Sequence, residues 1–254
     1  MLQDILSTDV FKLLLVFARF GAAMMLFPGI SSVTVVVRAR LLLALAIAFL
    51  LLPVLAPHLP PMPRDPMSMF ILIGTEVTVG IFLGAVTQIL VSPLDLAGNT
   101  MGYAIGLTNM FTFDPTTQQQ SQLITGFLNL TGITLVFLTD THHLMLRALV
   151  DSYGLFTPGQ PLPMDDFATT LLRTLGDSFV MGFKLAAPFL VFSVTFNAGL
   201  GLLNRLVPQI PVFFVGLPVQ ILGGLALLMV CMPPIMYWFL RHFSDGIGAF
   251  VASE

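Results

Sequence analysis

The sequence predicts an all-α, polytopic membrane protein made of kinked apolar helices and helical hairpins. Hydrophobic residues make up 56% of the 254 residues, charged residues make up only 9%, and the mean hydropathy is +0.95. A soluble domain has about 25% charged residues, so the chain falls outside that class. The apolar residues gather in about six segments, which suits helices that pack in an apolar environment.

Charge and motifs exclude several classes of function. The formal net charge of −3 leaves no broad basic surface, so we expect no nucleic-acid partner. The chain lacks the GxxxxGK[ST], GxSxG, HExxH and CxxC patterns of nucleotide-binding, hydrolase, metal and redox sites. We therefore expect no enzyme activity, no cofactor and no small-molecule substrate. The neighbouring His142 and His143 point in different directions from a helix, so we also expect no metal site.

The first half of the chain predicts three apolar helices, at residues 11–27, 41–52 and 68–91. Six prolines between positions 53 and 66 predict an extended, stiff connector between the second helix and the third. Pro93 should end the third helix, and Asp95 can cap the next one.

Charged side chains inside the apolar segments need an explanation. A charge in an apolar helix costs about 2.5–3.5 kcal/mol on insertion scales, so it normally faces a partner or a cavity. Glu76 also fits proton or ion coupling, or a segment that lies outside lipid. Lys184 also fits an extension of its side chain toward a polar boundary. We predict inter-helix or inter-subunit polar contacts for Arg19, Glu76, Lys184 and Arg205.

A polar, aromatic-bearing break at residues 106–122 interrupts the apolar segments. It ends in a helix-start signal, because Asp114 can accept hydrogen bonds from free N–H groups and Pro115 has no N–H to satisfy. Residues 107–113 should therefore form a tight loop between two helices. The helix before the loop ends in a ladder of small residues that lets helix backbones approach closely, formed by Gly98, Gly102 and Gly106.

The helix predicted after this loop, residues 115–138, carries an uncharged polar stripe. Two interpretations of the stripe stay open: polar packing between helices, and a wall that faces water or an unfolded polypeptide. Steps of four, three and four place its members on one face, namely Gln118, Gln122, Thr125 and Asn129.

The last part of the chain predicts a polar interval followed by a helical hairpin. Residues 140–177 hold the histidine pair, several charges and several prolines, so they should lie outside the bilayer core. Residues 179–203 and 212–240 are apolar and suggest two helices of one hairpin. Prolines should kink or break the second of them, at Pro218, Pro233 and Pro234.

Several short motifs follow one another along nearly the whole chain, and their order is part of the signal. They are ARFG at 18–21, Glu76 followed by Gly80 and Gly84, GLTNMFTFDP at 106–115, DTHHLMLRAL at 140–149 and NRLVPQIPVFFVGLPVQI at 204–221. In this combination the chain resembles the FliR family of flagellar type III export-apparatus proteins. The FDP triplet followed by Gln and Ser, the histidine pair and the closing R-x-x-P-Q block are the most specific elements of the resemblance.

The resemblance implies a non-enzymatic subunit of the flagellar export gate, through which unfolded flagellar proteins pass. Its partners would be several copies each of FliP and FliQ, together with FlhB, membrane lipid and the unfolded export substrates. Its location would be the bacterial inner membrane at the flagellar basal body. A single export-gate domain, residues 1–254, would join a FliP-like part at 1–178 to a FliQ-like hairpin and tail at 179–254, with much of its apolar surface buried against neighbours.

The resemblance also maps the family's pore-plugging loop onto residues 106–122. An ordinary loop buried between subunits is the alternative. If the loop is the plug, the polar stripe that follows it faces the lumen. The residues assigned to the plug are Gly106, Met110, Phe111, Phe113, Asp114 and Pro115.

Two other functions stay open. The injectisome counterpart of this family shares the architecture, and the chain carries no readable code for its substrates. An independent secondary transporter would use Arg19, Glu76 and Lys184 as a coupling relay. That function also predicts an inverted repeat, which the sequence does not show.

Overall fold

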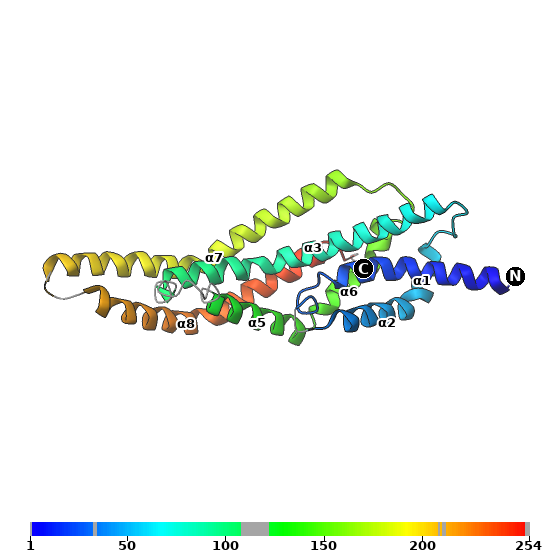
Figure 1. Ribbon diagram of the computed structural model, residues 1–254. Coiled ribbons are helices and arrows are strands. Elements are labelled where there is room, and N and C mark those ends of the chain that lie inside the picture. Colours follow the sequence, from blue (N-terminus) through cyan, green and yellow to red (C-terminus); the bar gives the residue numbers. More distant parts are fainter. Residues whose placement is uncertain (1, 33–34, 108–121, 208, 210–211, 252–254) are drawn as a thin grey trace. The chain divides into compact units, whose positions relative to one another are not determined.

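The computed structural model describes residues 2–32, 35–107, 122–207, 209 and 212–251 (Figure 1). The elements in chain order are α1 (Leu2–Met24), α2 (Val37–Leu55), the short 3-10 helix η1 (Ala56–His58), α3 (Pro66–Ala104), α5 (Gln122–Leu138), α6 (His142–Leu155), α7 (Met164–Leu206) and α8 (Val212–Gly248). These ranges contain no strand, so the all-α prediction is confirmed.

Several helices are long and apolar enough to cross a membrane. Within the described part of the chain there are four of them: Val37–His58, Pro66–Ala104, Met164–Leu206 and Gly216–Gly248. The pair α5 and α6 adds a fifth if it counts as one broken span. This agrees with the membrane class and is close to the six or so apolar segments predicted.

Prolines interrupt the helices less than the sequence suggested. α3 runs without a break for 39 residues and contains Pro93, so the predicted helix end at Pro93 and the cap at Asp95 are wrong. Packing explains the continuity, because Val91 and Leu94 on either side of Pro93 are only 5% and 0% exposed. α7 likewise continues through Pro188, and α8 continues through all three of its prolines.

The chain packs into two compact units. Unit 1 comprises residues 1–90, 137–175 and 243–254, and unit 2 comprises residues 91–136 and 176–242. The long helices α3, α7 and α8 each contribute to both units. This division describes packing, so the boundary between FliP-like and FliQ-like parts near residue 178 stays a prediction.

Unit 2 has an apolar core drawn from four helices. The last part of α3 lies in this core together with α5, α7 and α8. Side chains that are completely buried there, or nearly so, are Leu94, Ala97, Met101, Leu128, Ala186, Phe189 and Phe239.

In unit 1, α1 and α3 approach each other closely at two glycines. A Cβ atom at Gly84 would lie 2.8 Å from Cβ of Leu26 and 3.0 Å from the carbonyl oxygen of Ala23. One turn earlier, a Cβ atom at Gly80 would overlap the carbonyl oxygen of Arg19. The Gly80-xxx-Gly84 spacing thus serves as a small-residue contact between helix backbones.

Replacing Gly80 with leucine should destabilise unit 1 by about 1–3 kcal/mol or more, because the new side chain would push α1 away from α3. Gly74 supplies the matched control on the same helix, since nothing lies within 4 Å of a Cβ atom placed there. Thermal unfolding of the purified full-length chain in detergent measures both variants. Equal melting temperatures for Gly80→Leu and Gly74→Leu would contradict the close contact.

Candidate functional site

Unit 1 contains a buried ion pair. Arg19 on α1 and Glu76 on α3 are 57 residues apart in the sequence, and their side chains are each only 1% exposed. Nε of Arg19 donates to Oε2 of Glu76 at 2.7 Å, and Nη2 donates to Oε1 at 3.1 Å. The guanidinium therefore binds the carboxylate through two parallel hydrogen bonds, the strongest geometry available to this pair.

α6 completes the surroundings of Arg19. Nη1 of Arg19 donates to Oγ of Ser152 at 2.9 Å, and Nη2 donates to the carbonyl oxygen of Phe156 at 2.9 Å. The guanidinium also lies 3.8 Å from the ring centroid of Tyr153, within the range of a cation–π contact. The hydroxyl of Ser152 in turn donates a hydrogen bond to the carbonyl oxygen of Leu149 at 2.6 Å.

This cluster joins three helices through one buried cation. The close approach at Gly80 lets Arg19 reach Glu76, which lies one turn before Gly80 on α3. The sequence predicted polar contacts for Arg19 and for Glu76 but did not identify their partners. It assigned no contact to Ser152 or Tyr153, and the only signal for them was that they follow the histidine motif closely in the sequence.

The other two charged residues predicted to make polar contacts lie elsewhere. Lys184 and Arg205 are both on α7, in unit 2, and both side chains are exposed. Their inter-helix or inter-subunit contacts stay a prediction. The exposure of Lys184 also fits the alternative that its side chain extends toward a polar boundary.

Most residues of the predicted plug lie outside the part of the chain that the structure describes. They are Met110, Phe111, Phe113, Asp114 and Pro115, and Gln118 of the polar stripe also lies outside it. The start of the break is described. Gly106 follows the end of α3 with φ of +79°, the left-handed conformation that glycine adopts readily after a helix. Its N–H donates to the carbonyl oxygen of Tyr103 at 3.1 Å.

A glutamine of α8 holds the end of α3 just before this break. Nε2 of Gln220 donates to the carbonyl oxygen of Ala104 at 2.9 Å, and the side chain is only 8% exposed. This bond satisfies a carbonyl that the helix itself leaves free at its end. Gln220 was not predicted from the sequence, although an amide side chain in the apolar 212–240 segment was a possible signal.

Two members of the polar stripe contact α3 within unit 2. Thr125 is 7% exposed, and its hydroxyl donates to Oδ1 of Asn99 at 3.2 Å. One turn later, Nδ2 of Asn129 donates to Oδ1 of Asp95 at 2.5 Å. These contacts are the inter-helix packing that the sequence left open as one interpretation. The lumen-facing assignment of the stripe stays a prediction.

The profile of the family described as "Bacterial export proteins, family 1" matches residues 10–246 of the chain. The chain belongs to this family. Membership agrees with the resemblance that the motifs indicated, since curated relatives of this chain are named FliR.

Three curated relatives illustrate the similarity, and each is named flagellar biosynthetic protein FliR. The Caulobacter vibrioides protein is 35% identical over 235 residues, which cover 92% of this chain and 94% of the relative. The Escherichia coli K12 protein is 31% identical over 222 residues, or 86% and 83% of the two chains. The Aquifex aeolicus protein is 29% identical over 246 residues, or 94% and 92%.

Proposed function

We propose that this chain is a non-enzymatic subunit of the flagellar type III protein export gate and forms part of the channel for unfolded flagellar proteins. The observation that carries the proposal is the family match over residues 10–246. The relatives reported above are all named as flagellar proteins, which favours the flagellar function over the injectisome alternative.

The surface of the helices supports a subunit that is surrounded by lipid and by other apolar proteins. Large apolar side chains are well exposed on three helices: Leu50 on α2 at 72%, Val194 on α7 at 71% and Met229 on α8 at 80%. They belong to a large set of exposed apolar side chains, and extensive apolar surface is typical of contact with lipid or with other proteins. In the proposed assembly, copies of FliP and FliQ, together with FlhB and membrane lipid, cover them at the basal body in the inner membrane.

The buried cluster supports a structural use of the charges. Arg19 and Glu76 satisfy each other inside unit 1, with further partners on α6. A carboxylate held in this way suits a rigid subunit better than a relay that must load and release a proton or an ion. The independent transporter therefore has no specific observation in its favour.

Deleting the gene for this chain should abolish secretion of hook and filament proteins and leave the cells without filaments. Immunoblots of the culture medium and electron microscopy of the cells measure the two effects. A plasmid copy of the gene is the control and should restore both. Cells that lack the chain but still carry normal filaments would contradict the proposed function.

A further inference from the structure

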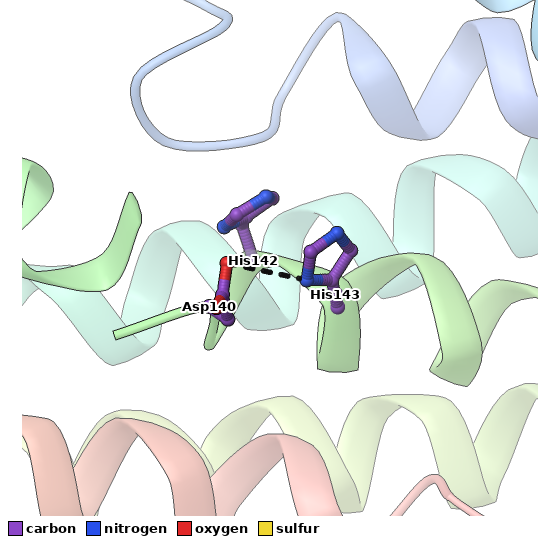
Figure 2. Close-up of side chains that lie close together, drawn as sticks. All are labelled: Asp140, His142 and His143. Atoms are coloured by element: carbon purple, nitrogen blue, oxygen red, sulfur yellow. Dashed lines mark ion pairs between the residues drawn. The ribbon is translucent and has the colours of Figure 1, made fainter. Parts of the chain in front are cut away.

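Three side chains that can bind metal ions lie together at the turn between α5 and α6 (Figure 2). Asp140 lies on the turn, and His142 and His143 are the first two residues of α6. One ligand atom from each side chain lies within 4.8 Å of the other two. All three residues belong to unit 1, so the cluster lies within one compact unit.

The backbone of the turn holds Asp140 in an unusual conformation. Asp140 has φ of 57°, and within the described ranges it is the one non-glycine residue with positive φ. Aspartate tolerates this left-handed conformation better than most residues do. The N–H of His143 donates to the carbonyl oxygen of Asp140 at 2.9 Å, which fixes the position of the turn relative to the first residues of α6.

The distance between Asp140 and His143 suits a shared cation better than a direct hydrogen bond. Figure 2 shows Oδ1 of Asp140 and Nδ1 of His143 joined by a dashed line, at 3.6 Å. Hydrogen bonds between such atoms measure about 2.7–3.2 Å. Two ligands that each lie about 2.0–2.1 Å from one tetrahedral zinc ion are about 3.4 Å apart.

His142 is held in place but has an unsatisfied ring nitrogen. Its ring stacks on Phe137 at 4.9 Å between centroids, and it lies 4.1 Å from the ring of His143. Nδ1 of His142 is inaccessible to solvent and has no hydrogen-bond partner. Buried ring nitrogens normally have a partner, so this nitrogen is an unused polar group on one of the three side chains.

We propose that Asp140, His142 and His143 bind a first-row divalent cation, and that Zn²⁺ suits them best. Two imidazoles and one carboxylate are a ligand set that zinc accepts, with water in the remaining position. The two neighbouring histidines alone predicted no metal site, because they point in different directions from a helix. The third ligand comes from the turn before that helix. The proposal does not depend on the export function.

Zinc binding by the full-length chain, purified in detergent without a histidine tag, tests the proposal. Competition with a chromophoric chelator should show one Zn²⁺ per chain. Asp140→Asn and His143→Gln should each weaken binding about tenfold or more. Both side chains are exposed, at 76% and 65%, and asparagine tolerates the positive φ, so these variants should keep the melting temperature of the wild type.

Cobalt provides an independent readout, because Co²⁺ absorbs visible light more strongly in a tetrahedral site than in water. The wild-type chain should show this absorption, and His143→Gln should lose it. His58→Gln is the matched control, since His58 is an exposed histidine on η1 that is not part of the cluster. Absence of zinc binding by the wild type, wild-type affinity for zinc in Asp140→Asn and His143→Gln, or loss of binding in His58→Gln would overturn the proposal.

Discussion

Replacing Arg19 with methionine should lower the free energy of unfolding by about 3–5 kcal/mol. The substitution leaves the carboxylate of Glu76 buried without its partner, and it removes the donors that serve Ser152 and the carbonyl of Phe156. Methionine keeps much of the side-chain volume, so the loss reports on the charge and the hydrogen bonds more than on a cavity. Thermal unfolding of the full-length chain in detergent measures the effect.

Three further variants identify the source of this loss. Arg19→Lys keeps the charge but cannot form the two parallel bonds to Glu76, so it should be intermediate. The double variant Arg19→Met with Glu76→Leu removes both charges and should recover most of the stability. Arg38→Met, at an exposed position on α2, should change the stability by only about 0.5 kcal/mol.

The double variant also distinguishes a structural ion pair from a coupling relay. A chain that needs Glu76 to carry protons or ions would stay inactive in the double variant, even if its stability returned. We expect secretion of hook and filament proteins to recover together with stability. Recovery of stability without recovery of secretion would contradict the structural assignment of the pair.

Deleting residues 107–113 should make the cell membrane leaky to ions, because the proposed plug loses the apolar part that fills the channel. The expected result is a large increase in conductance when the assembled export complex is placed in a planar lipid bilayer. Replacing the same seven positions with glycine and serine keeps the chain length but removes the bulk, so it should leak as well. Unchanged conductance in both variants would contradict the plug assignment.

Gln220→Leu tests the anchor before the loop, which is the hydrogen bond from Gln220 to the end of α3. This change removes the bond from Nε2 of Gln220 to the carbonyl oxygen of Ala104 while keeping an apolar side chain of similar size. Loss of one buried hydrogen bond costs about 1–3 kcal/mol, which should loosen the end of α3. We expect a small leak, well below that of the deletion. A leak as large as that of the deletion would place the seal at the anchor and not at residues 107–113.

Much of the fold was predictable because composition and periodicity act locally. A composition of 56% hydrophobic and 9% charged residues, gathered in long apolar runs, favours apolar helices, and the described structure is helical where the apolar segments are. The error at Pro93 came from a local rule as well. Proline removes one backbone hydrogen bond, but burial on both sides of it outweighed that loss and kept α3 continuous.

The sequence by itself determined the membrane class, the all-α architecture, the need of Arg19 and Glu76 for partners, and the small-residue spacing at Gly80. Only the tertiary structure decided which side chains meet. Arg19 and Glu76 are 57 residues apart, and Gln220 is 116 residues from Ala104, so no local pattern joins them. The turn that brings Asp140 to the histidines depends on one backbone angle of +57°, which the order of the residues does not reveal. Contacts between distant segments follow from how the helices pack, and packing depends on the whole chain at once.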